Sequence, residues 1–592
     1  MTETTDTQLP PILDAYAALR CARRTHNDFD ETVPAALGQH EFSPEVQARF
    51  DAGIEFDALI RRQISAALGD HCMDVTELGL FRDAATTQTV TAMNQGVPVI
   101  LGGRLPDDDV GGRRGKPDVL VRAAERSDGR LAYVPVDIKR HKTLASAKDS
   151  SPPALTSPAY APFREHATPL IEFTARKHER DAIQLAHYWR MLEACQRAPD
   201  GSPFGGIIGT DELGDGFLVV WHDLTEPLFR TFSRSADSGY VLRSAMQRYD
   251  HEFAFRSQVA TVARERTGRP TDPTPLVEPI YIKECDDCPW FDNCIDQLGE
   301  SDASAGVGRL SQREWIALRN LGLTDIDHLA ALDTDVIDGG AGTSDAASER
   351  TLQLMADYLP EVSHLPNARK RLRGAVMAAQ MVQEGTYLRR TTTGPVPIER
   401  ADIEIDFDIE YDRDGRVYLW GMLVTDRTAN SSTFEHVSTW GDIDDTREAA
   451  LAVQFWHRLT DIVARAHTAG QSVKVYHYAN PEPNHLRRIA EASADHDLPT
   501  LDAVNALIDD TFIDMFPIVR ANFFGRDGLG LKVAATRGAG FSWRDEDPGG
   551  LQSITWLEQV RAGVDDLRQR VLEYNEDDVR ATQALREWLA QQ

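Results

Sequence analysis

The sequence predicts an α/β protein with more than one domain, and three observations lead to this prediction. Residues 116–139 read as a β-hairpin, because two short apolar runs flank a turn near Gly129. Residues 402–410 alternate strictly between apolar and acidic side chains, which is typical of a strand. Amphipathic helical segments accompany both strand regions, and a chain of 592 residues is too long for a single domain.

The composition narrows the class of protein. Hydrophobic residues make up 42% of the chain, and no stretch approaches the ~20 apolar residues of a membrane span. Residues 1–11 are polar and lack the features of a signal peptide, so we expect a soluble, cytoplasmic protein with no membrane partner. The net charge of -30 argues against a generic nucleic-acid coat. It does not argue against a nuclease, because acids gathered at metal sites belong to that chemistry.

The hairpin at residues 116–139 carries the first candidate site. Its second limb alternates between an apolar face and a face with Asp137 and Lys139. A turn centred after Ser127 places Asp118 opposite Asp137 in an antiparallel register. Two carboxylates and an amine suit hydrolysis of a phosphodiester with Mg²⁺ or Mn²⁺, which the carboxylates hold while the lysine orients water. The alternative interpretation is a solvated hairpin face with a surface ion pair.

Two sequence motifs in this hairpin resemble a known nuclease superfamily. Pro117-Asp118 and Asp137-Ile138-Lys139 are similar to the PD-(D/E)xK motif. The resemblance implies a restriction-endonuclease-like fold for the N-terminal part of the chain. Residues 144–168, rich in Ser, Pro and Ala, are expected to form a loop rather than a core element.

Motifs on either side of the hairpin resemble the RecB-type branch of that superfamily. Gln184 and Tyr188 lie one turn apart on a predicted helix and are similar to its Q-x3-Y motif, which positions DNA or supports the metal shell. Residues 53–57 are similar to its first motif, which supplies a further metal ligand. The resemblance implies Asp57 in that role, with Glu55 as a rival.

Three of the six cysteines form a cluster, Cys285-x2-Cys288-x5-Cys294. In a large cytosolic chain this spacing indicates a metal rather than disulfides. RecB-type nucleases of the AddB and CRISPR-associated kind use one cysteine before the nuclease core and three after it to hold a [4Fe-4S] cluster. Cys21 matches the early position better than Cys72, so the resemblance implies that Cys21 is the fourth ligand. Zn²⁺ is the alternative cofactor.

The acidic strand at residues 402–410 carries the second candidate site. Five acids on one strand face repel one another unless water or cations screen them. Residues 407–410 resemble the D-x-E first motif of DEDD exonucleases, which have the ribonuclease H-like fold. The resemblance implies that Asp408 and Glu410 bind metal. The alternative is an edge strand with a solvated acidic face.

Two further segments resemble later motifs of DEDD exonucleases. Tyr574 and Asp578, one helical turn apart, are similar to the closing Y-x3-D motif, in which the aspartate binds metal and the tyrosine helps to place the attacking water. In the middle motif the nearest acid is Glu482, with Asp514 as a second candidate. The alternatives are a solvated acidic helix face at Tyr574 and a degenerate domain that only binds a nucleic-acid end.

The order of these motifs predicts three parts. Residues 1–300 are expected to form a RecB-like nuclease domain with the cysteine cluster, and residues 395–592 a ribonuclease H-like DEDD exonuclease domain with a mixed sheet. Residues 301–394 are expected to form a helical linker, in which residues 309–332 resemble a helix-hairpin-helix segment with two short helices joined at Gly322. The order resembles a RecB-family nuclease joined to a YprB-like ribonuclease H domain.

This resemblance implies a metal-dependent deoxyribonuclease that acts on DNA ends in repair, processing or defence. DNA is favoured over RNA as the substrate. No Walker A phosphate loop is apparent, so any ATP-driven unwinding would come from a separate helicase. Two alternatives stay open: a nucleic-acid-binding scaffold with degenerate sites, and an RNA-directed 3′ exonuclease that acts through the C-terminal domain.

Overall fold

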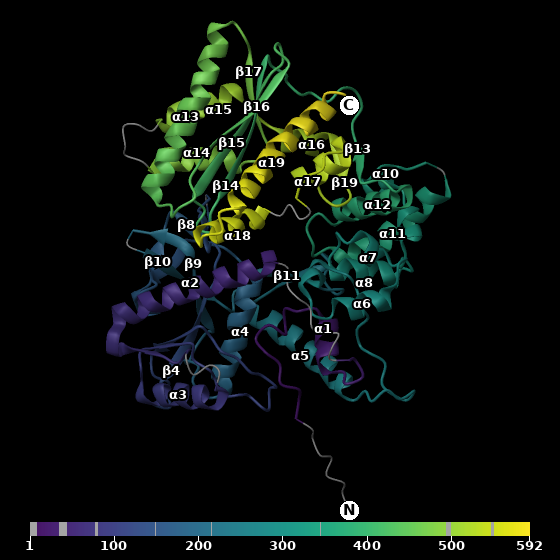
Figure 1. Cartoon of the computed structure of the whole chain (residues 1–592). Helices are drawn as coiled ribbons and strands as arrows, with labels where there is room; N and C mark the ends of the chain where they lie inside the picture. The colour runs from purple at the N-terminus through teal and green to yellow at the C-terminus, as the bar shows by residue number, and fades with distance from the viewer. Residues whose placement is uncertain are drawn as a thin grey trace, which may run out of the picture. The chain divides into compact units, whose positions relative to one another are not determined.

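The computed structural model divides the chain into two compact units. It describes residues 9–34, 44–76, 81–148, 150–214, 216–343, 345–492, 499–545 and 550–592. Unit 1 comprises residues 1–376 and unit 2 residues 377–592. Both units have a mixed α/β architecture (Figure 1). Within the described residues, no helix is long and apolar enough to cross a bilayer.

Unit 1 is organised around an eight-stranded mixed sheet with the order β1-β2-β3-β4-β9-β10-β6-β7. β1 runs parallel to β2 and β4 parallel to β9, whereas the other neighbours are antiparallel. In the order of the sheet the strands are β1 (Cys72–Asp74), β2 (Val99–Leu101), β3 (Val119–Ala123), β4 (Ala132–Ile138), β9 (Phe204–Leu213), β10 (Gly216–Asp223), β6 (Ala154–Pro158) and β7 (Thr168–Leu170).

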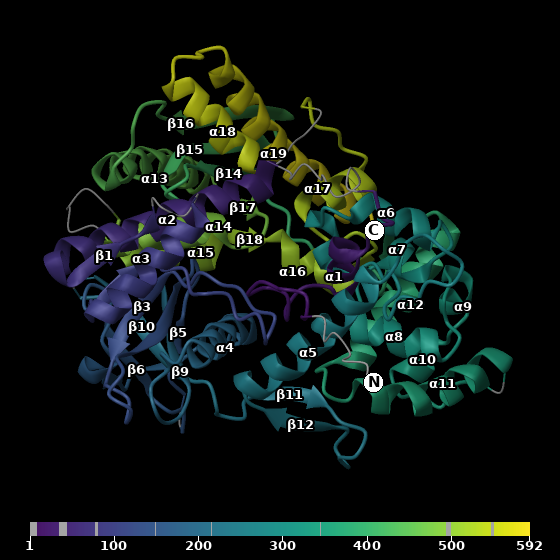
Figure 2. The same cartoon turned by 90° about the horizontal axis from the view of Figure 1, so that it is seen from below.

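Two small strand pairs and a set of helices complete unit 1. The small pairs are β5 (Leu144–Ser146) with β8 (Phe173–Ala175), and β11 (Phe229–Phe232) with β12 (Tyr240–Arg243). The helices around the sheet are α1 (Ala22–Phe29), α2 (Pro44–Leu68), α3 (Arg82–Gln95), α4 (Glu179–Ala194) and α5 (Ala245–Arg264). α4 packs against β4 and β9, and α5 lies beside α4 with the β11–β12 hairpin next to it (Figure 2).

The β3–β4 hairpin has the predicted register, and its acidic face is buried rather than exposed to solvent. Val119 pairs with Val136, and the continued ladder puts Asp118 opposite Asp137. β4 lies between β3 and β9 and is buried along its whole length. Asp137 has 0% of its surface exposed, so the interpretation as a solvated hairpin face is wrong. Segments from distant parts of the chain cover this face, and the alternation of residues within the hairpin does not indicate that they do so.

Residues 144–168 are not the loop that their composition predicted. They contain β5 and β6, and β6 pairs with β10 inside the main sheet. In that ladder Leu155 pairs with Trp221, whose indole Nε1 donates a 3.0 Å hydrogen bond to Ser157 Oγ. Pairing with a long apolar strand therefore decides the local structure, because strand preference depends strongly on tertiary context.

The chain continues from the sheet into a helical segment. As predicted, residues 309–332 contain two short helices, and Gly322 between them has a φ of 82°. Ser311 begins the first of them with a capping box that includes Glu314. The helices of this segment are α6 (Phe291–Leu298), α7 (Ala303–Val307), α8 (Gln312–Asn320), α9 (Ile326–Ala330), α10 (Thr334–Ile337), α11 (Ala346–Val362) and α12 (Ala368–Glu384), of which α12 includes the boundary between the units.

Unit 2 is organised around a five-stranded mixed sheet with the order β16-β15-β14-β17-β18. The strands are β14 (Ile403–Tyr411), β15 (Val417–Asp426), β16 (Ser431–Ser438), β17 (Val473–His477) and β18 (Phe512–Asp514), and β13 (Leu388–Arg390) pairs separately with β19 (Phe523–Gly525). The helices are α13 (Asp445–Thr468), α14 (Pro481–Ala492), α15 (Leu501–Thr511), α16 (Met515–Asn522), α17 (Leu531–Ala534), α18 (Gly550–Arg561) and α19 (Leu567–Leu589).

The acidic strand β14 is the central strand of this sheet, so the edge-strand alternative is wrong. Its apolar residues face α13, where the rings of Phe407 and Phe455 stack with centroids 4.8 Å apart. Its acids face α19, the helix that crosses the sheet in Figure 1. There the buried Arg586 pairs with Glu404 and lies 2.7 Å, Nη2 to Oδ2, from Asp406. Arg586 thus pairs with both acids nearest the start of the strand, and Arg400 is a second partner of Glu404.

Replacing Arg586 should destabilise unit 2 strongly. Arg586→Ala leaves Asp406 buried without a cation and Glu404 with Arg400 as its remaining close partner, which costs about 3–5 kcal/mol in the free energy of unfolding. Urea denaturation followed by circular dichroism measures this loss. Arg580→Ala, on the same helix but with 40% of its side chain exposed, should change the unfolding free energy by less than about 0.5 kcal/mol. Equal stability of the two variants would contradict the prediction.

Candidate metal centres

The first centre lies where β3 begins and β4 ends in unit 1. The Ile138 backbone N–H donates a 2.8 Å hydrogen bond to Asp118 Oδ2, and Lys139 Nζ lies 2.8 Å from Asp137 Oδ2. Burial, followed by the charge of Asp137, raises the pKa of Asp118 well above its ordinary value. Burial opposes the charge on Lys139, but Asp137 and Asp118 outweigh it and raise the pKa of this lysine. Lys139 therefore stays protonated beside two carboxylates.

α4 brings Gln184 and Tyr188 to the same centre. Gln184 Nε2 donates a 3.0 Å hydrogen bond to Tyr188 Oη, which in turn donates to the Lys116 carbonyl at 3.2 Å. Burial raises the pKa of Tyr188, and the charges of Asp137 and Asp118 raise it further. The predicted pair therefore lies close enough to feel both carboxylates.

His187, between these two residues in the sequence, fixes the helix from its other side. Its Nδ1 lies 2.9 Å from Tyr249 Oη and its Nε2 lies 3.0 Å from the Arg114 carbonyl oxygen. The carbonyl can only accept, so Nε2 carries the hydrogen and Nδ1 accepts from the tyrosine. Burial lowers the pKa of His187 to about 4, and the neutral ring satisfies both partners.

The structure separates the two candidates for the further metal ligand. On α2, Asp57 forms an ion pair with Arg61, and its charge contributes to the raised pKa of Asp118. Glu55 is exposed on the same helix. Asp57 is thus the better candidate. Among the described residues, however, Asp57 and Asp118 do not belong to a group of three ligand residues whose ligand atoms all lie within 4.8 Å of one another.

Tyr16 is a residue of this centre that the sequence did not indicate. Tyr16 keeps 43% of its surface exposed, but the loss of solvent around its hydroxyl raises its pKa, and it interacts electrostatically with Lys139 and Asp137. Tyr16 precedes α1 in a segment with no recognisable motif, so only the fold brings it to the site.

Four cysteines line one small cavity at another place in unit 1. They are the predicted set, Cys21, Cys285, Cys288 and Cys294, whereas Cys72 and Cys195 are not among the lining residues. None of the six forms a disulfide. Burial and the neighbouring thiols raise the pKa of Cys285 to about 12, which disfavours metal-free thiolates here. A bound metal would replace the thiol protons, so the donor set fits a thiolate-bound metal.

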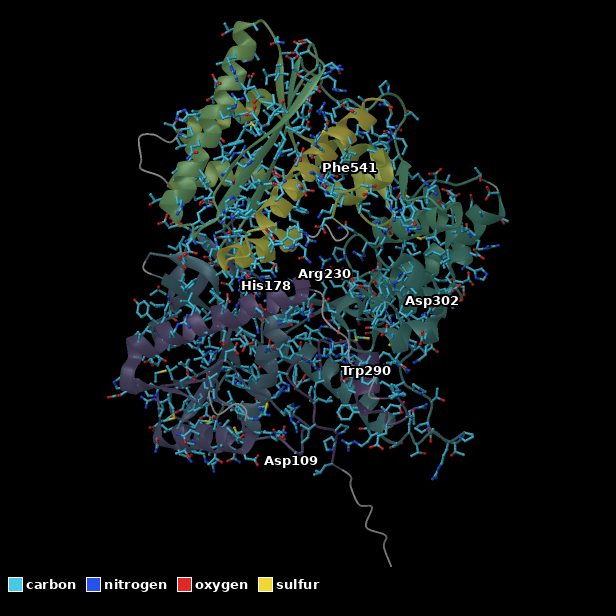
Figure 3. The ribbon with its side chains drawn as sticks, in the orientation of Figure 1. Asp109, His178, Arg230, Trp290, Asp302 and Phe541 are labelled. Atoms are coloured by element: carbon cyan, nitrogen blue, oxygen red, sulfur yellow. The ribbon has the colours of Figure 1, made fainter. Side chains whose placement is uncertain are left out.

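The walls of this cavity join the N-terminal segment to the segment around α6. The Cys21 backbone N–H donates to Glu284 Oε1 at 3.0 Å, and Asn27 Nδ2 lies 3.7 Å from Cys294 Sγ. The Trp290 indole, labelled in Figure 3, donates a 2.7 Å hydrogen bond to Asp28 Oδ1. These contacts hold the early cysteine beside the late ones.

The second centre lies in unit 2, where α19 meets the end of β14. Asp408 and Glu410 are two residues apart and therefore point to the same face of the strand. α19 adds Asp578, and the carboxylate oxygens of the three residues lie within 4.8 Å of one another. They line a cavity of about 470 Å³ together with Glu482 and Tyr574.

The electrostatics of this second centre fit a divalent cation. Burial is the main cause of its raised pKa values, which are about 8 for Glu410 and about 6 for Asp578. Burial also raises the pKa of Asp408 well above its ordinary range, and Asp578 and Glu410 raise it further. Carboxylates are the hard oxygen ligands that Mg²⁺ and Mn²⁺ prefer. A cation held here would relieve the mutual repulsion of the three acids.

Hydrogen-bond donors orient the acids of the second centre. Asn575 Nδ2 donates to Asp408 Oδ2 at 2.8 Å, and Trp543 Nε1 donates to Asp578 Oδ1 at 2.7 Å. Lys532 Nζ donates to Tyr574 Oη at 2.9 Å. Partners of this kind fix metal ligands in place. The sequence did not indicate Asn575, Trp543 or Lys532 as members of the site.

Glu482 rather than Asp514 supplies the fourth acid. Glu482 lies in the first turn of α14 and lines the cavity, where burial raises its pKa to about 8. Asp514 instead begins α16, where its Oδ1 accepts hydrogen bonds from the backbone N–H groups of Phe516 and Ala479, both at 2.9 Å. The cavity therefore gathers acids from β14, α14 and α19.

Comparison with protein families bears on the second unit. A family model described as the RNase H superfamily matches residues 405–590. Unit 2 contains a ribonuclease H-like domain. The matched range includes both acids of β14 and Asp578 of α19, and it indicates a nuclease-type function on nucleic acid that uses Mg²⁺ or Mn²⁺. Neither the curated proteins nor the solved structures gave a match.

Outside the ribonuclease H-like domain, His187 predicts a pH dependence of stability in unit 1. Its pKa is about 4 in the folded chain and about 6.5 when unfolded. A lowered histidine pKa contributes stability that is complete above pH 6.5 and is lost as the pH falls toward 4. The loss reaches up to about 3 kcal/mol.

Urea denaturation of the wild type and of His187→Gln at pH 7 and pH 4.5 measures this contribution. The glutamine does not titrate, so the variant should lose less stability between the two pH values than the wild type. His166→Gln, an exposed histidine, serves as the control and should behave as the wild type does. Equal losses in all three proteins would contradict the assignment.

Proposed function

We propose that this protein is a metal-dependent deoxyribonuclease that removes nucleotides from DNA ends. The observation that carries the proposal is the group of four acids around one cavity of the ribonuclease H-like domain, of which Glu410, Glu482 and Asp578 are buried and Asp408 is half-buried. Burying four carboxylates together is costly unless cations accompany them. Two divalent ions would activate water and stabilise the leaving oxygen of a phosphodiester.

In this domain the protein's own residues position ligands and water. Asp408, Glu410, Glu482 and Asp578 hold the metal ions. Tyr574, whose hydroxyl accepts a hydrogen bond from Lys532, places the attacking water. Because Lys532 is a cation next to that hydroxyl, it also attracts the phosphate group of the substrate.

We assign a second nuclease centre to unit 1, within a restriction-endonuclease-like domain of the RecB type at residues 1–300. The hairpin register and the grouping of the buried Asp137 with the half-buried Asp118 and Lys139 support this assignment. Asp57, Asp118 and Asp137 hold the metal, and the charged Lys139 steadies the negative charge that develops on the phosphate. Gln184 and Tyr188 orient this arrangement. Residues 301–394 are the helical linker to the exonuclease domain at residues 395–592.

The four cysteines are proposed to hold a [4Fe-4S] cluster. Four thiolates around a single Zn²⁺ ion would lie about 3.8 Å apart, since Zn–S bonds are about 2.3 Å and tetrahedral. In the part of the chain that the structure describes, no three of these cysteines have their sulfur atoms all within 4.8 Å of one another. The wider spacing supports a larger group than one zinc ion.

Preference for DNA is supported by the resemblance of the unit 1 motifs to RecB-type nucleases. DNA repair, processing or defence is the corresponding role. We also propose that a separate helicase supplies unwound ends. The competing function is a nucleic-acid-binding scaffold, and the cleavage experiment below separates the two.

Cleavage of end-labelled single-stranded DNA, duplex DNA and RNA with Mg²⁺ or Mn²⁺ tests the two centres. Asp408→Asn removes a metal ligand of unit 2, and Lys139→Ala removes the cation of unit 1. Each should lower the cleavage rate of its centre by about 100-fold or more. Asp509→Asn and Lys148→Ala, both exposed, are matched controls and should cut at the wild-type rate.

The variants that lose cleavage show which of the two centres cuts the substrate. Loss of DNA cleavage in Lys139→Ala with full activity in Asp408→Asn would place cleavage in unit 1. A wild type that binds all three substrates and cuts none would sink the nuclease proposal in favour of the scaffold. Cleavage of RNA alone, abolished by Asp408→Asn, would replace the deoxyribonuclease with an RNA-directed exonuclease.

Anaerobic purification tests the cluster. The wild type should show a visible absorbance band, and Cys288→Ala should lose both the band and iron, because a ligand is missing. Cys195→Ala, which lies outside the cavity, should keep the band. A colourless wild type loaded with zinc would overturn the iron-sulfur assignment.

A further inference from the structure

A third group of metal-ligating side chains lies in unit 1, apart from the acids and the cysteines. It consists of His141, His178 and Asp181, whose ligand atoms all lie within 4.8 Å of one another. His141 follows β4 and Lys139, His178 directly precedes α4, and Asp181 lies in the first turn of α4. Nothing in the nuclease centres described above uses these three side chains.

One backbone carbonyl orients both imidazoles. His141 Nδ1 lies 3.3 Å from the Lys142 carbonyl oxygen, and His178 Nε2 lies 3.2 Å from the same oxygen. Because a carbonyl only accepts, each of these nitrogens is the donor, and His178 Nδ1 keeps its lone pair for a ligand. His141 Nε2 lies against a carboxylate, so it gives up its proton when an ion binds there. Metal-bound histidines characteristically donate their second N–H to a carbonyl in this way.

The remaining nitrogen of His141 already faces a carboxylate. His141 Nε2 lies 3.0 Å from Asp181 Oδ2, and the rings of His141 and His178 are 4.3 Å apart between centroids. Two imidazoles and one carboxylate thus converge on a single point. The first-row transition ions accept this donor set, whereas Mg²⁺ prefers oxygen ligands alone.

The backbone fixes the two segments that carry these ligands. The Thr210 N–H donates to the His141 carbonyl at 3.0 Å, which ties the loop to β9. The Arg176 N–H donates to the Thr143 carbonyl at 2.8 Å, which ties the segment before His178 to the same loop. The site is therefore held in place before any ion arrives.

We propose that His141, His178 and Asp181 bind a divalent transition ion, with Zn²⁺ as the preferred species. Three protein ligands leave a coordination position open, as in catalytic rather than structural zinc sites. His178, labelled in Figure 3, is exposed, so solvent and ligands reach the ion. Asp181 interacts electrostatically with Lys139, so the bound ion adds a positive charge beside the proposed nuclease centre, where a phosphate oxygen of the substrate can take the open position.

Zinc titration of the full-length protein, by calorimetry in excess Mg²⁺, tests this site. The excess Mg²⁺ occupies the carboxylate centres. The wild type should bind one more molar equivalent of Zn²⁺ than His178→Gln and than His141→Gln. His166→Gln, an exposed histidine that is not one of the three ligands, should bind as much Zn²⁺ as the wild type.

Two controls show that any loss of zinc binding comes from this site. Cys288→Ala should retain the equivalent that His178→Gln loses, which separates this site from the cysteine cavity. Thermal unfolding without added metal should be the same for His178→Gln and the wild type, because that side chain is exposed. Equal zinc binding by the wild type and both histidine variants would overturn the proposal. The readout is zinc bound rather than DNA cleaved, so it stands or falls separately from the nuclease function.

Discussion

The burial of acids along the central strand of unit 2 is the constraint on which that unit depends. Side chains of one strand face must all point to the same side, so an acid at every second position of β14 brings four carboxylates under α19. Arg586 compensates Glu404 and Asp406 permanently. Among the residues that the structure describes, no arginine forms an ion pair with Asp408 or Glu410, and burial together with neighbouring acids raises their pKa values. The first half of the strand thus belongs to a structural ion-pair network, and its second half carries the candidate metal ligands.

The sequence predicted local pairing better than burial. The hairpin register followed from the position of one turn, because a fixed turn determines every later pair. Burial of the polar faces of β4 and β14 did not follow, since the covering strands and helices come from distant parts of the chain. Residues 144–168 show the same limit: β6 is a strand because β10 offers it a partner.

The candidate sites were predictable to the extent that their residues form short motifs. Spacing such as Gln184 to Tyr188, or Cys285 to Cys294, can be read directly from the sequence. Cys21 required a resemblance, because it lies 264 positions before the next cysteine of its cavity, Cys285. Tyr16, Trp543 and Lys532 belong to no motif, and only folding brings them to a site. The same holds for His141, which approaches His178 across a strand pair.

α4 connects several of these features through one rigid element. Asp181, Gln184, His187 and Tyr188 serve different partners from successive positions on a single helix. Each residue of an α-helix is turned about 100° from the one before it. An insertion of one residue between Asp181 and Tyr188 would therefore rotate one set of side chains away from its partners while leaving the other in place. The number of residues between Asp181 and Tyr188, about two helical turns, is therefore constrained as tightly as the identities of the four side chains.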